Sequence, residues 1–289
     1  MLIKKKLYNF VSGSFRSINY DVVSQFKAKM PAPHPTEPID IVIPVVPKDL
    51  DILPTCLEGI RRNFANVISG IYLVAPENDE IRAFAQAQGV DFVLESSVLG
   101  FDKSYIPYRD KKGNDRSGWI FQQLLKLSGA IGENRYFITI DSDHILLAPH
   151  TFLADDGKPV FYMSKEFYYP YYLTFKHFFN HFPYARYSYV AHKMIFDKNR
   201  LASMRDLIEA RAGGRKWYDA LIDFLKKNKN CSLSEFEMYG HFHTSKHHVL
   251  WRQKELSKVS GTFYEYDALK SLYGDKYLSV TFPDYRKRK

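Results

Sequence analysis

The sequence predicts an α/β fold in which a mainly parallel central sheet is flanked by helices. Three observations support this class. Short runs rich in β-branched and aromatic residues recur along the chain, and segments with helical spacing separate them. The run at 39–45 is almost continuously apolar, which is typical of a strand buried on both faces. This alternation of strands and helices favours parallel pairing through right-handed crossovers.

The first half of the chain is regular, and the second half is less so. Gly89 is expected to end a helix in the left-handed conformation, and 100–117 reads as a polar loop. The aromatic segment 167–189 has no clean period. The expected strands are 39–45, 71–74, 91–94, 136–140, 160–163, 188–196, 263–266 and 278–282, and the expected helices are 50–64, 79–88, 119–127, 202–212 and 217–227.

Residues 1–38 are expected to form a basic leader and linker, because four prolines between 31 and 38 break any helix there. Within it, 7–26 fits a short amphipathic helix that packs on the domain or touches a membrane. The rest, 39–289, is expected to be one domain with two halves, 39–145 and 146–289.

Composition narrows the partners. The chain has 289 residues, 45% of them hydrophobic, so a large core is available, and its net charge of +9 favours anionic partners. Both ends are basic, which fits either solvated tails or contact with an anionic membrane. No nucleic-acid motif is present, so no nucleic-acid partner is expected. The two cysteines lack metal-site spacing, and no apolar run reaches ~20 residues, so a cytoplasmic location is expected, with peripheral membrane contact as an alternative.

Two carboxylates directly follow the strand expected at 136–140. Asp141 and Asp143 would point to the same side of an extended chain. Ligands of open α/β sheets bind beyond the carboxyl ends of the strands. Mg²⁺ and Mn²⁺ prefer oxygen ligands, commonly one or two carboxylates together with substrate phosphates. The pair is therefore interpreted as a metal site, and the alternative is a turn that merely ends the strand.

The order of strands and helices, from a first strand at 41–45 to a strand that ends in the Asp-x-Asp triplet, resembles the GT-A glycosyltransferases, which have a Rossmann-like fold. Three motifs, in this order, resemble an uncharacterised bacterial glycosyltransferase-like family: Gly118-Trp119-x-x-Gln122-Gln123-x-x-Lys126, the triplet, and Ser234-Glu235-x-Glu237-x-Tyr239-Gly240. The resemblance covers about 39–250 and does not specify a sugar. It implies one catalytic domain at 39–289, in which 39–145 would bind a nucleotide sugar and 146–289 an acceptor.

The resemblance implies a donor site and a cofactor. Nucleotide-sugar contacts would come from the end of the first strand, the following helix and the triplet, and the metal would be Mn²⁺ or Mg²⁺. Arg and Lys beside a diphosphate form charge-assisted hydrogen bonds, but an amphipathic helix with solvated cations explains them equally. The implied donor residues are Pro44, Val45, Arg116, Gln123, Lys126 and Asp141.

Glu235 and Glu237 are the candidate catalytic bases, because an inverting transferase needs a carboxylate to take the acceptor proton. Both also fit a helix capping box, so one would cap while the other acts. If the enzyme retains configuration, no such base is required and both would position substrate. His241 and His243, alternating on extended chain, are candidate metal ligands beside Asp141 and Asp143. His192 and Lys193 are candidate acceptor contacts, with a surface pair on an edge strand as the alternative.

The function predicted from these features is a metal-dependent glycosyltransferase. It would move a sugar from a nucleoside diphosphate to a glycan or lipid-linked acceptor, by inversion, in bacterial surface polysaccharide synthesis such as capsule or lipopolysaccharide. One alternative is a sugar-1-phosphate nucleotidyltransferase, although the Gly-rich loop that it would carry after the first strand is missing at 46–50. The other is a non-catalytic basic protein that docks on membranes.

Overall fold

The computed structural model describes residues 14, 15, 18, 22, 30–183, 188–242, 249–251, 260–261 and 265–285. Most of the helix expected at 7–26 lies outside them. The end of the predicted linker packs on the domain, where His34 N donates to Leu153 O over 2.9 Å and Thr151 Oγ1 donates to Pro31 O over 2.8 Å. Among the described residues, no helix combines the length and apolar character that crossing a bilayer requires.

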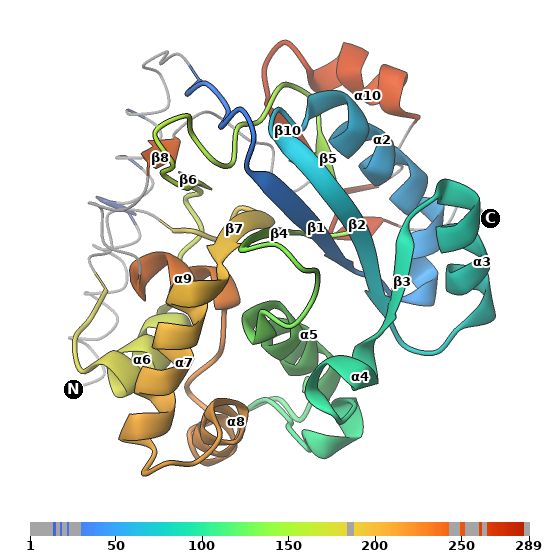
Figure 1. The fold of residues 1–289 in the computed structure, drawn as a ribbon. Coiled ribbons are helices and arrows are strands. Elements are labelled where there is room, and N and C mark those ends of the chain that lie inside the picture. Colours follow the sequence, from blue (N-terminus) through green and yellow to red (C-terminus); the bar gives the residue numbers. More distant parts are fainter. Residues whose placement is uncertain are drawn as a thin grey trace.

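The centre of the molecule is a five-stranded sheet, which confirms the predicted α/β class (Figure 1). Its first four strands pair in parallel, and the last strand pairs antiparallel to its neighbour. Every residue of the strand at 136–140 is buried, as its β-branched and aromatic sequence predicts. In spatial order the strands are β3 (Asp91–Leu94), β2 (Val67–Ala75), β1 (Pro38–Pro44), β4 (Tyr136–Ile140) and β7 (Lys193–Asp197).

Helices follow the strands and end where the sequence predicts. The side chain of Asn78 accepts a hydrogen bond from Ile81 N and begins α3 (Asp79–Gln88), and Gly89 ends it at φ 64°. The remaining helices of the first half are η1 (Pro47–Asp51), α2 (Leu53–Asn63), α4 (Glu95–Leu99), η2 (Lys103–Tyr105) and α5 (Ser117–Ser128).

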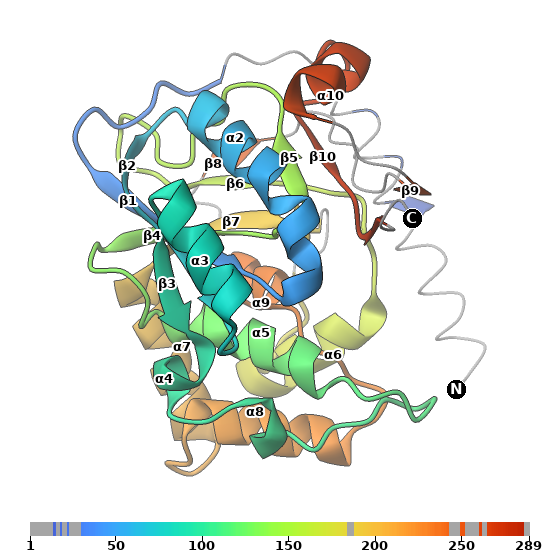
Figure 2. The same cartoon turned by 90° about the vertical axis from the view of Figure 1, so that its right-hand side faces the viewer.

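The helices of the second half are α6 (Tyr169–Phe179), α7 (Lys198–Arg211), α8 (Trp217–Lys227), α9 (Glu235–Phe242) and α10 (Tyr266–Tyr273). In Figure 1 the first four of them lie below the sheet, whereas α2 and α3 lie at its right and α10 lies at the upper right, next to α2. In Figure 2, α5 lies between α4 and α6, and α8 lies beneath them.

Among the described residues there are also three two-stranded sheets. β5 (His144–Leu146) pairs antiparallel with β10 (Ser279–Thr281), directly after the Asp-x-Asp triplet. β6 (Val160–Tyr162) pairs with β8 (Val249–Trp251), and β9 (Ser260–Gly261) pairs with β11 (Asp284–Tyr285), both in parallel.

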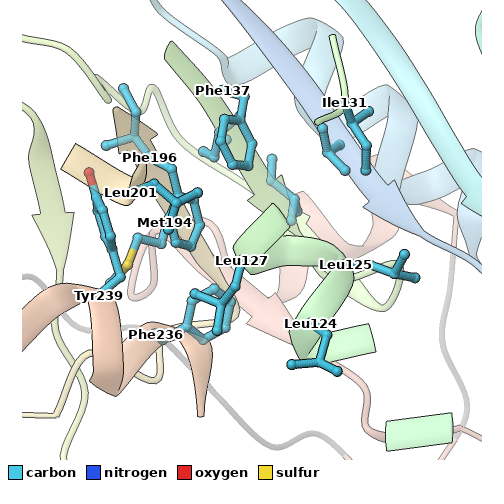
Figure 3. Packing of buried hydrophobic residues seen from close by; sticks show 14 of the residues in the cluster. Leu124, Leu125, Leu127, Ile131, Phe137, Met194, Phe196, Leu201, Phe236 and Tyr239 are labelled. Atoms are coloured by element: carbon cyan, nitrogen blue, oxygen red, sulfur yellow. The ribbon is translucent and has the colours of Figure 1, made fainter. Parts of the chain in front are cut away.

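The main core fills the space between the sheet and the helices below it. Figure 3 shows Leu127 of α5 and Phe236 of α9 beside Met194 and Phe196 of β7. All four side chains are at most 3% exposed. Burial of side chains of this size stabilises a fold by about 1.5–3 kcal/mol each. This packing fixes α5 and α9 against the sheet, and both helices carry predicted site residues.

Several sequence predictions of secondary structure are wrong or incomplete. The strand predicted at 188–196 begins only at Lys193, because the backbone of His192 is left-handed, with φ 59°. The segment 167–189 contains α6, because Pro170 at its start and the apolar contacts of Tyr172 and Phe175 favour a helix without a clean period. His241 lies in α9 rather than on extended chain. Tyr266 begins α10 instead of ending a strand, and the rest of the strand predicted at 263–266 lies outside the described residues.

Candidate functional site

The predicted carboxylates lie at the carboxyl edge of the main sheet. β4 ends at Ile140, and Asp141 and Asp143 form the turn into β5. β1 is the parallel neighbour of β4, so its end at Pro44 and Val45 comes to the same edge. The side chains of Pro44 and Val45 are buried, so any donor contact from them would be made by their backbone. This edge is where ligands of open α/β sheets bind.

Lys126 joins two of the predicted acids. Its Nζ lies 2.7 Å from Asp141 Oδ1 and 2.7 Å from Glu235 Oε1. Burial disfavours the Lys126 ammonium, but attraction to the two carboxylates outweighs it and raises the lysine pKa. Gln123 lies one turn earlier on α5, and its Oε1 accepts a hydrogen bond from Glu235 N over 3.3 Å. Lys126 and Gln123 are each 5% exposed. Through the bonds just described, these buried side chains hold the start of α9 and the Asp141 carboxylate in place.

His192 holds the other oxygen of Asp141. Its Nδ1 lies 3.0 Å from Asp141 Oδ2, and Asp141 N donates to His192 O over 3.0 Å. The His192 backbone is left-handed, with φ 59°, which is uncommon for a residue other than glycine. Burial favours the neutral imidazole, but the bond to Asp141 prevails and raises the pKa of His192. Nε2 of His192 bonds no other described residue and is open to a ligand.

Asp141 and Asp143 differ strongly in their surroundings. Burial opposes the charge of Asp141, but Lys126 and His192 hold its pKa well below the ordinary value. No other described residue bonds the Asp143 carboxylate. Burial and the neighbouring charges of Asp141 and Asp49 raise the pKa of Asp143 to about 6. The charge of His192 counteracts this shift in part, but Asp143 is the member of the pair that no cation of the described residues bonds.

The two glutamates at the start of α9 also differ. Glu237 Oε1 accepts hydrogen bonds from Tyr172 (2.8 Å) and Ser188 (2.6 Å), and its Oε2 lies 2.9 Å from His241 Nε2. Glu237 N donates to Ser234 Oγ over 3.3 Å, which is half of the predicted capping box. Glu237 is thus occupied in holding α9 against α6.

Glu235 keeps one oxygen available. Its Oε1 meets Lys126, whereas no other described residue bonds Oε2. Burial raises the pKa of Glu235 despite the attraction of Lys126. The residue is only 2% exposed, so contact with a substrate requires the start of α9 to move.

The predicted metal ligands are only partly assembled. Asp143 has a free carboxylate, while both oxygens of Asp141 already have partners within the protein. His241 packs against Glu237 and the rings of Tyr172 and Tyr189, and His243 lies outside the described residues. In the described part of the chain, no three His, Cys, Asp or Glu side chains form a group able to hold a metal ion on their own. The residues fit a metal that takes one carboxylate from the protein and its other ligands from a substrate diphosphate and water.

Lys193 and Arg116 take different places from those expected. Lys193 is fully buried, with Nζ 3.2 Å from His144 Nε2 and 4.5 Å from the centre of the Tyr162 ring. Arg116 is exposed at the start of α5, with its guanidinium 5.4 Å from the centre of the Trp119 ring. Ten helical residues, about 15 Å, separate it from Lys126.

Sequence reasoning missed three contributors. Asp49 is 6% exposed and raises the pKa of Asp143, and Cys56 Sγ lies 3.8 Å from Asp141 O. Glu166 acts on His192 electrostatically. Asp49 follows β1 closely, so its position at the carboxyl edge was a usable signal. Cys56 and Glu166 carried no signal, because only the folded chain brings them to the triplet.

Comparisons with known proteins identify a family. The model of a protein family described as "Family of unknown function (DUF6492)" matches residues 36–268, so the chain belongs to that family. A search of the curated proteins finds no match.

Solved structures similar to this one include several glycosyltransferases. Mouse xyloside xylosyltransferase 1 is 11% identical with a TM-score of 0.46, over 85% of this chain and 98% of its own. The glycosyltransferase GlyE of Streptococcus pneumoniae is 12% identical with a TM-score of 0.39, over 75% and 45%. Glucosyl-3-phosphoglycerate synthase of Mycobacterium tuberculosis, solved with Mn²⁺, UDP and glucosyl-3-phosphoglycerate, is 16% identical with a TM-score of 0.25, over 38% and 34%. The match thus spans about a third of the length of the synthase.

Proposed function

We propose that this member of the family transfers a sugar from a nucleoside diphosphate to a glycan or lipid-linked acceptor, with inversion and with the help of a divalent metal. The observation that carries the proposal is the asymmetric carboxylate pair at the end of β4. Asp141 is fixed by Lys126 and His192, whereas the Asp143 carboxylate bonds no other described residue. A carboxylate with a raised pKa beside a second acid is a suitable partner for a cation and a diphosphate.

The chain's own residues would divide the work. A Mg²⁺ or Mn²⁺ ion held by Asp143 would supply positive charge against the leaving diphosphate. Lys126 and His192 keep Asp141 ionised and in place, so Asp141 acts through position and charge. Nε2 of His192 is open to a phosphate or an acceptor hydroxyl, and the raised pKa of His192 favours its charged form.

We assign the catalytic base to Glu235 rather than Glu237. In an inverting transfer the acceptor oxygen bonds to C1 of the sugar, the bond from C1 to the diphosphate breaks, and the acceptor proton passes to a carboxylate. Glu235 has a free oxygen and a raised pKa, which makes it a stronger base. Both oxygens of Glu237 already have partners. The setting we propose is bacterial surface polysaccharide synthesis in the cytoplasm, at or near the membrane.

A thermal-shift scan tests the proposal. We expect UDP, GDP, CDP or CMP to raise the melting temperature more with Mn²⁺ than without, since a ligand at 100 times its Kd stabilises a protein by about 2.7 kcal/mol. Asp143→Ala should remove the part of the shift that depends on Mn²⁺. The control Asp275→Ala, an exposed residue in the turn after α10, should keep it. If none of the four nucleotides stabilises the protein, the transferase proposal fails.

The assignment of the base has its own test. Glu235→Gln should lower kcat by about 10²–10⁴-fold and abolish the acid limb of the pH profile, while KM for the donor stays near its original value. If the variant keeps that acid limb, Glu235 only positions Lys126 and is not the base.

A further inference from the structure

A hollow lies at the opposite end of α5 from Lys126. It has a volume of about 710 Å³ and is formed by the starts of α5 and α6 and by the loop between η2 and α5. It contains none of Pro44, Asp141 or Asp143. A neighbouring hollow of about 830 Å³ shares Tyr108, Trp119 and Lys229 with it, so the two form one trough. Each volume lies within the range of about 300–1,000 Å³ that is typical of sites for small molecules.

Aromatic rings form the floor of the trough. Trp119 stacks on Tyr171 with ring centres 6.4 Å apart and planes at 24°, and Tyr168 meets Tyr171 edge-on at 4.9 Å. Trp119 and Tyr171 are half-buried, and Tyr168 is 48% exposed. Broad, partly exposed rings on rigid helix starts offer flat apolar surfaces on which a ligand ring can lie.

The rim of the trough is basic. Lys111, Lys112, Arg116 and Lys229 line the first hollow against Asp110 and Glu166, and none of these four cations forms an ion pair in the described part of the chain. Asp110 is already occupied, because it accepts hydrogen bonds from the backbone of 112 and 114 and from the Asn114 side chain. Lys229 donates to Arg109 O over 2.8 Å and lies over the Tyr108 ring, and Arg116 lies over the Trp119 ring, so none of these contacts neutralises a charge of the rim. Cations that no carboxylate neutralises, above an aromatic floor, favour a ligand that combines rings with negative charge.

The trough shares two helices with the site at the sheet edge. Trp119 and Lys126 both belong to α5, seven residues or about 10 Å apart along the helix. Tyr171 of α6 is followed by Tyr172, whose hydroxyl donates to Glu237 over 2.8 Å. A saccharide in the trough would therefore lie against the same two helices that hold the acids of the site.

We propose that this trough binds an acidic saccharide, whose rings lie on Trp119 and Tyr171 and whose carboxylates or phosphates face Arg116 and Lys111–Lys112. The proposal rests on the proposed function in one respect, because it makes this saccharide the acceptor. It moves Arg116 from the predicted donor site to the acceptor side. Carboxylate and phosphate share the chemistry that the rim recognises, and the experiment separates them.

The test is a binding measurement without donor or metal, so its outcome is independent of donor binding. Tryptophan fluorescence is recorded with oligogalacturonate, with a phosphorylated oligosaccharide and with a neutral oligosaccharide of equal length. We expect at least one acidic ligand to quench the fluorescence at least tenfold more tightly than the neutral one. Trp119→Phe should remove the quench, since Trp119 is the one of the chain's 3 tryptophans that lines both hollows. The tighter of the two acidic ligands identifies the anionic group.

Charge-reversal variants locate the binding. Lys111→Glu with Lys112→Glu, and separately Arg116→Ala, should weaken acidic binding at least tenfold; all three positions are exposed, so the fold should survive. The matched control Lys216→Glu, an exposed lysine before α8 and outside the trough, should leave it unchanged. Equal binding of the neutral ligand, failure of both acidic ligands, unchanged binding in the rim variants, or displacement by UDP would each overturn the assignment. Acidic binding without any nucleotide stabilisation would instead refute the transferase and leave a saccharide site.

Discussion

Asp143→Asn should make the protein more stable at neutral pH, although it removes the proposed metal ligand. Burial, and then the charge of Asp141, raise the pKa of Asp143 from its ordinary value to about 6. The folded state therefore binds more protons than the unfolded state between about pH 4 and pH 6, and stability falls as pH rises through that window. A pKa difference of about two units between the folded and unfolded states corresponds to about 3 kcal/mol of stability. Because Asp143 is partly exposed, we expect a loss of about 1–3 kcal/mol.

The assay is thermal unfolding in the presence of a chelator from pH 4 to pH 8. The amide cannot ionise, so Asp143→Asn should unfold about 2–6 °C higher than the wild type at pH 7–8, and the difference should vanish near pH 4. Asp275→Asn removes a charge from an exposed turn and should change the melting temperature little at any pH. A variant no more stable than the wild type at pH 7–8, or a gap that persists at pH 4, would refute the reasoning.

Three further variants probe the support of the site. Lys126→Met leaves Asp141 and Glu235 without their shared cation and should cost about 3–5 kcal/mol in urea unfolding, part of which Glu235→Gln in the same chain should restore. Gly240→Ala would place a methyl group 2.5 Å from the Tyr189 ring, so a loss of about 1–3 kcal/mol in thermal unfolding is expected; an unchanged melting temperature would contradict this packing. His192→Gly removes the bond to Asp141 but tolerates φ 59°, so unfolding free energy should change by less than about 1 kcal/mol while turnover falls at least tenfold.

The main sheet could be predicted from sequence because its signals are local. β-branched runs mark β1 and β4, and Gly89 marks the end of α3 with no need of distant contacts. The position of the Asp-x-Asp triplet follows from the end of β4 in the same way. α6 was missed, because aromatic residues on several of its faces hide the helical period that one-sided burial would give.

The connections within the site could not be predicted, because they join residues far apart in the chain. Lys126 meets Asp141 across 15 positions and Glu235 across 109. Neither spacing has a periodic signature, so the sequence placed Lys126 near the donor but did not predict its two carboxylate partners. The fold turns the ammonium inward, where these two carboxylates stabilise it. Arg116 on the same helix lies about 15 Å away and serves a different surface.

Each acidic pair separates into one residue held by the protein and one with an oxygen to spare. Asp141 and Glu237 have protein partners on both oxygens, whereas Asp143 and Glu235 do not. Loss of turnover on replacing Asp141 or Glu237 would therefore be ambiguous, because the same change removes buried hydrogen bonds and destabilises the fold. If Asp143→Asn loses turnover while its stability rises, destabilisation of the fold cannot explain the loss. That result would locate the substrate at Asp143.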